Sequence, residues 1–181
     1  MTGTSLEALA PYFYQVAYVV RDLAAAEAWF KKILVVPSWA RMENIAFGAD
    51  CGYRGRPSDS AAHLSVGYLR GTQIELIEPI RGESLYTEFL AAKGPGLHHL
   101  AFDVPDFGGT VAALRESGLE LLAQGRVGPG SEFAYFDCTS AEASVIEILG
   151  FDEGVRAFMK QLEQQSAEAA RARDEASSES P

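Results

Sequence analysis

Four polar side chains recur at equivalent positions of two repeated segments in this chain. The segment that begins at Gln15 (QVAYVVRDL) matches the one that begins at His99 (HLAFDVPDF), with similar apolar residues at most of the same steps. A second pair of segments, QIELI and VIEIL, aligns Glu75 with Glu147. Because a repeated unit places equivalent positions across a pseudo-twofold axis, we expect the four side chains to face one another. An amide oxygen, an imidazole and two carboxylates in one place predict a metal site.

The alternation of strand residues indicates which way these side chains point. In the strand expected near residues 97–104, His99 and Ala101 share one face, and the apolar residues between them share the other. The same alternation sends Glu75 and Glu147 into the hollow of a curved sheet, while their isoleucine neighbours lie under helices. Carboxylates in an apolar hollow are neutralised, paired or bound to a cation, because their desolvation is costly.

This ligand set favours a six-coordinate divalent ion with room for one or two waters. Zn²⁺, Co²⁺, Ni²⁺ and Mn²⁺ suit it better than ions that prefer thiolates. Such an ion can polarise a substrate carbonyl, and a neighbouring glutamate can then move the proton on the adjacent carbon. We therefore predict one divalent metal ion held by Gln15, Glu75, His99 and Glu147. Of these, Glu147 and Glu75 are the predicted catalytic residues.

Two β-α-β-β-β modules must position these residues. Each copy begins with a strand, and Asp22 or Asp106 then provides the N-cap of a helix, after which three further strands follow. The expected fold class is α+β, in which the two tandem modules form a cupped, barrel-like mixed sheet with the helices outside. The expected segments are an N-terminal extension (1–11), the first module (12–80), a linker helix and turn (81–96), the second module (97–150) and a C-terminal helix with a flexible tail (151–181).

The first module carries an insertion that the second lacks. Gln15 and His99 are 84 residues apart, whereas Glu75 and Glu147 are 72 apart. The difference of 12 fits residues 48–60 (GADCGYRGRPSDS), which are expected to form a loop. The tail begins with apolar residues at helical spacing and then loses them, so we expect the helix to fray beyond about Ala170.

Composition excludes several classes of function. The net charge of −10 is unsuited to nucleic acid or an anionic membrane surface, because phosphate binding requires clustered basic residues. Two cysteines are too few for a disulfide framework. Residues 1–14 lack the features of a signal peptide, and no apolar run approaches the roughly 20 residues of a membrane span. We therefore expect a cytoplasmic protein without a membrane partner.

Three segments carry a resemblance to a known family: IELIEP (74–79), EFLAAKGPGLHHLAFDV (88–104) and AYFDCTSAEASVIEIL (134–149). On these residues the chain resembles the vicinal oxygen chelate superfamily, which includes glyoxalase I, methylmalonyl-CoA epimerase, bleomycin resistance proteins and extradiol dioxygenases. The resemblance implies the same four ligand positions, a small-molecule substrate with a carbonyl group, and a homodimer. The run GLHHLAFDV looks most like the epimerase branch, whereas the ligand set matches one glyoxalase I pattern.

Three functions follow from this resemblance. The first is a metal-dependent lyase or isomerase/epimerase that moves a proton next to a metal-bound carbonyl. The alternative is a metal-free ligand-binding or drug-sequestering protein of the same fold, in which Gln15 marks a site that has lost its metal. A ring-cleaving dioxygenase comes third, because that branch is expected to have histidine where this chain has Gln15, and glutamine weakens iron binding.

Other residues have simpler interpretations. His98 points away from His99 along the strand and is expected to be structural, under a helix or near the junction of the modules. Asp103 shares the face of His99 and is expected either to orient it or to bind substrate. Glu43 is a possible proton-transfer partner but is better interpreted as a solvated carboxylate, and Arg54 and Arg56 are weak candidates for holding an anionic thioester. Aromatic residues expected to line the core or the cup are Phe13, Trp29, Trp39 and Phe133.

Overall fold

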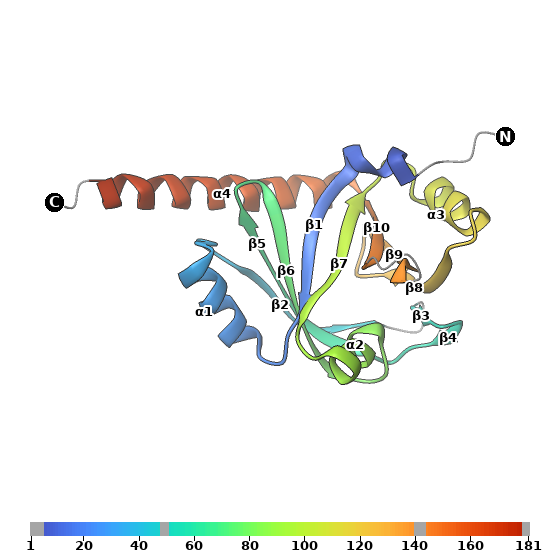
Figure 1. The fold of residues 1–181 in the computed structure, drawn as a ribbon. Helices are drawn as coiled ribbons and strands as arrows, with labels where there is room; N and C mark the ends of the chain where they lie inside the picture. The colour runs from blue at the N-terminus through green and yellow to red at the C-terminus, as the bar shows by residue number, and fades with distance from the viewer. Residues whose placement is uncertain (1–5, 48–50, 140–143, 179–181) are drawn as a thin grey trace.

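The two repeated modules appear in the computed structural model, which describes residues 6–47, 51–139 and 144–178. Each module folds as β-α-β-β-β, and the α+β, cupped-sheet prediction is confirmed (Figure 1). The first module contains β1 (Phe13–Val19), α1 (Leu23–Ile33), β2 (Ala40–Ala46), β5 (Ala61–Leu69) and β6 (Thr72–Arg81). The second contains β7 (Gly96–Asp103), α3 (Phe107–Glu116), β8 (Glu120–Arg126), β9 (Ser131–Asp137) and β10 (Val145–Phe151). Outside the repeat lie η1 (Leu6–Tyr12), β3 (Gly52–Tyr53), β4 (Arg56–Pro57), α2 (Leu85–Lys93) and α4 (Glu153–Ser178).

The first strands of the two modules join the modules at the centre of the sheet. Ten strands of the described residues form one curved sheet in the order β2-β5-β6-β1-β7-β10-β9-β8-β3-β4. At its centre β1 and β7 are antiparallel, and each is also parallel to the last strand of its own module. The four strands that carry the predicted ligands, β6, β1, β7 and β10, are therefore adjacent.

Strand alternation separates three apolar clusters, as the sequence predicts. Ile74 and Leu76 pack under α1, and Ile146 and Ile148 pack under α3. The opposite face of the same strands forms a third cluster inside the cup, which includes Ala17, Ala101 and Leu149. The glutamates that alternate with the isoleucines consequently point into the cup.

Side-chain caps fix the start of each helix. Asp22 accepts a hydrogen bond from the backbone N–H of Ala25, and Asp106 accepts one from Gly109. Both contacts confirm the predicted N-caps, which satisfy backbone donors that have no partner within the helix. At the end of α2, Gly94 has φ 80°, a left-handed conformation that favours glycine.

The insertion in the first module forms a hairpin rather than an unstructured loop. Strands β3 and β4 pair with each other, and β3 also pairs with β8 of the second module, with Gly52 opposite Gln124. The fit is close, because a side chain at Gly125 would collide with Cys51. Residues 48–50 of this insertion lie outside the described part of the chain. The hairpin extends the sheet edge that belongs to the second module.

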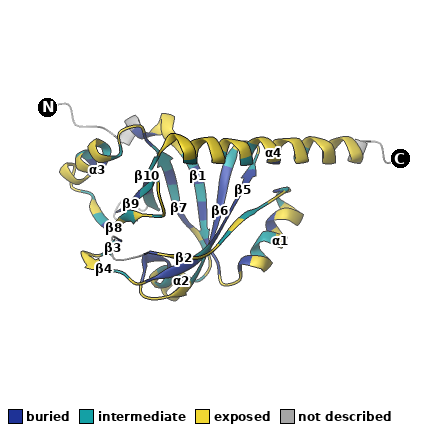
Figure 2. Cartoon of the chain, turned by 180° about the vertical axis from the view of Figure 1, so that it is seen from behind, coloured by how far each residue is buried: buried dark blue, intermediate teal, exposed yellow. Residues whose placement is uncertain are grey.

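The C-terminal helix is longer than the sequence predicts. Instead of fraying near Ala170, α4 continues to Ser178. Residues 155–178 contain neither glycine nor proline and are rich in alanine, glutamate, glutamine and arginine, which all favour a helix. The helix lies across one end of the central strands (Figure 1), and most of its surface is exposed (Figure 2). In the described part of the chain, no helix is both long and apolar enough to cross a membrane.

Two aromatic residues do not occupy the interior as expected. Phe133 is buried inside the cup and Trp39 is partly buried beneath α1, in agreement with the prediction. In contrast, Trp29 is 53% exposed and Phe13 is 45% exposed. Trp29 lies on the outer face of α1, and Phe13 lies at the very start of β1, where it packs on Phe102. The expectation for both residues rested on their apolar character rather than on the face of the helix or strand that each occupies.

Candidate metal centre

Two rows of side chains cross the four central strands on the inner face of the cup. Each row has a buried alanine on β1 or β7, flanked by polar residues on the neighbouring strands. Because a methyl group occupies little of the space above the sheet, the longer side chains on either side reach past it toward each other. The rows are Glu75–Ala17–His99 and Gln15–Ala101–Glu147.

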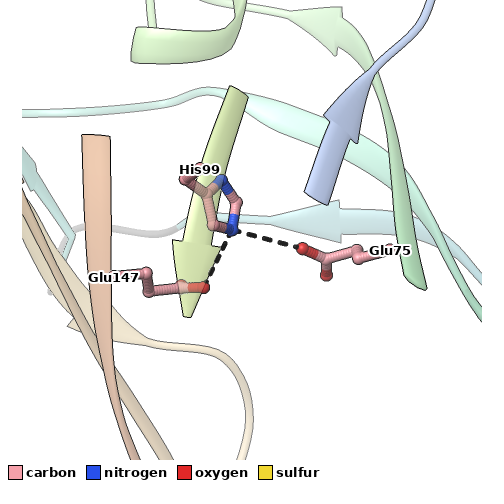
Figure 3. Close-up of side chains that lie close together, drawn as sticks. All are labelled: Glu75, His99 and Glu147. Atoms are coloured by element: carbon pink, nitrogen blue, oxygen red, sulfur yellow. Dashed lines mark ion pairs between the residues drawn. The ribbon is translucent and has the colours of Figure 1, made fainter. Parts of the chain in front are cut away.

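Three of the four predicted ligands meet at one point. His99 Nε2 lies 3.0 Å from Glu147 Oε2 and 3.7 Å from Glu75 Oε2 (Figure 3). One ligand atom from each residue lies within 4.8 Å of the other two. All three residues are buried, and His99 has no exposed surface. Groups at these separations could hold one metal ion.

Burial strongly perturbs the protonation of this cluster. Desolvation raises the pKa of Glu75 well above its usual value, and the charge of Glu147 raises it further. Desolvation raises the pKa of Glu147 to about 8, and it lowers the pKa of His99 to about 3. The imidazole is therefore neutral at pH 7, as a metal ligand must be, while the carboxyls need either protons or a cation.

The fourth predicted ligand, Gln15, lines the same cavity and has an oriented amide. Gln73 uses its amide hydrogens on the hydroxyls of Tyr14 (3.0 Å) and Tyr68 (2.7 Å), so its oxygen is left to accept from Gln15 Nε2 at 2.6 Å. This contact leaves Gln15 Oε1 buried without a hydrogen-bond partner among the described residues. Because an unsatisfied buried acceptor is costly, the free oxygen fits a bound cation.

His98 supports His99 from behind. The two Nδ1 atoms lie 2.8 Å apart, so one ring donates to the other. If His99 donates, its Nε2 lone pair is free to bind an ion, and its ring is held by the kind of outer contact that metal-binding histidines usually have. His98 is buried against Phe89 and Tyr86 of α2, so the prediction that it lies under a helix is correct. Its contact with His99 was not foreseen, because their side chains start on opposite faces of the strand.

Two tyrosines form a further part of the site that the sequence interpretation missed. Tyr135 is the cross-strand neighbour of Glu147, and its hydroxyl hydrogen bonds to that carboxyl and lowers its pKa. The hydroxyl of Tyr86 lies 2.8 Å from that of Tyr135. Gln73 was also missed, although it lies two residues before Glu75 and therefore on the same face. The contact between Tyr135 and Glu147 depends on the pairing of β9 with β10, which the sequence alone does not indicate.

A cavity of about 210 Å³ opens onto the cluster. Apolar side chains from β2, β5, β9 and β10 line most of it, and Val155, Phe158 and Met159 of α4 also contribute to its lining. The hydrogen-bond network of the site reaches this helix, because Tyr68, which binds Gln73, donates to the Met159 carbonyl at 3.1 Å. Helix α4 thus forms part of the wall of this cavity.

Three other candidates lie away from the cluster. Asp103 neither orients His99 nor lines the cavity, because it forms a two-pronged ion pair with Arg156 of α4 at 2.8 Å. Glu43 is exposed, as expected of a solvated carboxylate, and lies 3.9 Å from Arg41. Arg54 binds Glu88 at 2.9 Å and does not line the cavity, so it does not contribute to ligand binding there.

Comparison with known proteins identifies the class. The family described as the Glyoxalase/Bleomycin resistance protein/Dioxygenase superfamily matches residues 14–136, and the chain belongs to this superfamily. The resemblance to vicinal oxygen chelate proteins is thereby confirmed. No curated protein sequence matches the chain.

Several solved structures share the fold. Methylmalonyl-CoA epimerase from Mycobacterium tuberculosis is 23% identical, with a TM-score of 0.62 over 87% of this chain and 97% of that one. A hypothetical protein from Bacillus halodurans is 17% identical, with a TM-score of 0.60 over 78% and 94%. A variant of the Streptomyces coelicolor epimerase in complex with 2-nitronate-propionyl-CoA is 18% identical, with a TM-score of 0.59 over 78% and 95%. At these identities the similarity establishes the fold that the chains have in common.

Proposed function

We propose that this protein is a divalent-metal-dependent lyase or isomerase/epimerase that moves a proton on the carbon next to a substrate carbonyl. One observation carries the proposal: among the described residues, two carboxylates and an amide oxygen without a hydrogen-bond partner line one end of an apolar cavity, and a neutral imidazole nitrogen lies 3.0 Å and 3.7 Å from those carboxylates. Acceptors gathered in an apolar cavity need protons or a cation, and one divalent ion would satisfy all of them at once. Gln15, Glu75, His99 and Glu147 are the proposed ligands, and the epimerases among the structural neighbours are consistent with this class.

Some residues of the proposed centre would hold the metal ion, and Glu147 would transfer the proton. When bound, a divalent ion would act as a Lewis acid toward a carbonyl oxygen. Gln15 and His99 have fixed orientations, because Gln73 and His98 hold their other polar atoms. Glu147 is the residue that would accept and return the proton when it is displaced from the ion, because in the metal-free protein burial raises its pKa to about 8, close to neutral pH. Tyr135 holds the Glu147 carboxyl in place through its hydroxyl.

A second function is favoured by the cavity itself. Its lining is predominantly apolar and includes Phe47, Phe133 and Phe151, which suits retention of an aromatic ligand without chemistry. A protein of this kind would bind its ligand equally well with or without a divalent ion. The ring-cleaving alternative is weaker, because the amide of Gln15 stands where a second histidine would be needed for iron.

Metal analysis tests the proposed centre directly. We expect protein purified without chelator to contain close to one divalent ion per chain, and His99→Ala to lose most of it while remaining folded. The matched control is His63→Ala, because His63 lies outside the cavity and its Nδ1 accepts a hydrogen bond from the backbone of Asn44. Elemental analysis and circular dichroism would give both readouts. An unchanged metal content in His99→Ala would contradict the proposed site.

Solvent deuterium exchange tests the chemistry. We expect a panel of α-hydroxy, α-keto and thioester compounds to include one whose α-proton exchanges, and Glu147→Gln to lower that turnover by about 10²–10⁴, the usual contribution of a positioned acid or base. The amide preserves the size and one ligand oxygen but cannot accept the proton. Glu116→Gln, on the exposed surface of α3, serves as the control. Exchange that persists unchanged in Glu147→Gln would assign the base to another residue, with Glu75 the first candidate.

A further inference from the structure

The charges along the described walls of the cavity limit which ligands the proposed centre can hold. Of the described residues that line it, none is lysine or arginine. The acidic residues among them are Glu75 and Glu147, which are the proposed metal ligands, and most of the remaining surface is apolar. A ligand that enters this space therefore finds no side chain to neutralise a negative charge.

The arginines nearest the cavity along the chain are already engaged outside it, and Lys160, which follows the lining residue Met159, is exposed and does not line the cavity. Three arginines directly precede or follow a lining residue, namely Met42, Val127 or Val155. Each forms an ion pair with a carboxylate that does not line the cavity, so turning an arginine inward would leave that carboxylate without its partner. The pairs are Arg41–Glu27 at 2.6 Å, Arg126–Glu132 at 2.9 Å and Arg156–Asp103 at 2.8 Å.

The charges of the proposed centre also cancel. Two ionised carboxylates balance one divalent cation, while Gln15 and His99 are neutral. An additional carboxylate or phosphate in the cavity would be an unpaired charge in a space of low polarity, which is strongly unfavourable. Its volume of about 210 Å³ is somewhat larger than the roughly 150 Å³ of an apolar cavity known to hold benzene.

We propose that the substrate portion held in this cavity is a neutral, mainly apolar carbonyl compound, with a body about the size of one aromatic ring and its oxygen atoms directed to the ligand cluster. This inference rests on the proposed function and names the substrate class for it. Acyl groups that bear a carboxylate are therefore not expected to bind in the cavity. Affinity would come from apolar contacts with the walls of the cup and not from an ion pair. Phe47, Phe133 and Phe151 would contact the ring.

Two isosteric probes test the charge requirement without a known substrate. 2-Hydroxy-4′-nitroacetophenone and its 4′-carboxylate analogue have nearly the same shape and the same α-hydroxyketone head, but one is neutral and the other anionic. Calorimetry on zinc-loaded protein should show that the carboxylate binds about 100-fold more weakly, since its charge is buried without a partner. Equal affinities, or failure of the nitro compound to bind the metal-loaded protein, would overturn the inference.

A lysine introduced at the rim of the cavity provides a second test of the inference. Phe158 lines the cavity but is 51% exposed, so Phe158→Lys should fold and offer the missing cation. We expect this variant to reduce the affinity difference between the probes at least tenfold, while Ile80→Lys, at a similarly exposed site outside the cavity, leaves it unchanged. An unchanged difference in Phe158→Lys would overturn the inference. Absence of bound metal would instead contradict the proposed function, because the nitro-to-carboxylate preference can still be measured on metal-free protein.

Discussion

At the scale of single residues, the site depends as much on small side chains as on ligands. Ala17 and Ala101 stand between the polar residues of each row, and both are completely buried. A larger residue at either position would occupy the space in which the ligand atoms converge. The supporting contacts from Gln73, His98 and Tyr135 then fix the amide, the imidazole and the carboxylate in turn.

The protonation of Glu147 leads to a prediction for the metal-free protein. Its pKa is about 8 in the folded state and about 4.3 in the unfolded state, so the folded protein binds more protons between these values and loses stability as pH rises. His99, with its pKa lowered to about 3, acts in the opposite direction only below about pH 6.5. Between pH 6.5 and 8 the carboxyl effect is therefore unopposed.

We expect the free energy of unfolding of chelator-treated protein to fall by about 1–2 kcal/mol across this window. Urea denaturation at a series of pH values would measure it. The decline should become smaller in Glu147→Gln, in which only Glu75 still loses a proton, and it should disappear after addition of a divalent ion, which replaces the protons of both carboxyls. A flat profile for the metal-free wild type would show that burial does not hold this carboxyl protonated.

At the scale of secondary structure, the elements outside the repeat complete the pocket. The β3–β4 hairpin extends the sheet at β8, and α4 contributes the lining of Val155, Phe158 and Met159. Helix α4 is tied to the sheet by the Arg156–Asp103 ion pair and by two hydrogen bonds that involve Tyr68. These contacts connect the helix to the same strands that carry the ligands.

The ion pair at the start of α4 should control how firmly the pocket is closed. We expect Arg156→Ala to speed amide hydrogen exchange in the first turns of α4 and to lower stability by about 1–3 kcal/mol, because the buried side of Asp103 loses charged hydrogen bonds. Arg171→Ala, in the exposed final third of the helix, is the control. Exchange rates in α4 that match the wild type would mean that the apolar contacts alone hold the helix.

At the scale of the whole molecule, the homodimer implied by the family is still a prediction. An exposed apolar group on α1 is a candidate surface for it: Trp29 and Ile33 lie four residues apart and are both about half exposed, with Val35 just beyond. An apolar group of this kind on an acidic protein is typical of a surface that binds another protein.

We expect light scattering at micromolar concentration to give twice the mass of one chain. Introducing a charge with Trp29→Glu should shift the protein to the monomer mass, because an unpaired carboxylate would be buried in the interface. Ile80→Glu, at another exposed apolar position, should not. A monomer mass for the wild type at all concentrations would remove the dimer prediction, and a dimer that is unaffected by Trp29→Glu would place its interface elsewhere.

Much of this organisation is a property of the sequence. The repeat defines the two modules, and the period of two in each strand sends Glu75, His99 and Glu147 to one face of the sheet, where the structure brings them together. Both inferences need only local periodicity, because equivalent strands of a duplicated unit must pack in equivalent ways. The position of Gln15 beside the same cavity follows from the same alternation.

Other features were decided by contacts between residues far apart in the chain. Asp103 shares a strand face with His99, but it forms an ion pair with Arg156 because α4 docks beside it. The insertion that is expected to be a loop becomes a hairpin because β8 offers an unpaired edge. Tyr135 reaches Glu147 only through the pairing of β9 with β10. Periodicity indicates which face a residue occupies, but sheet curvature and the docking of distant elements determine which partner meets it there.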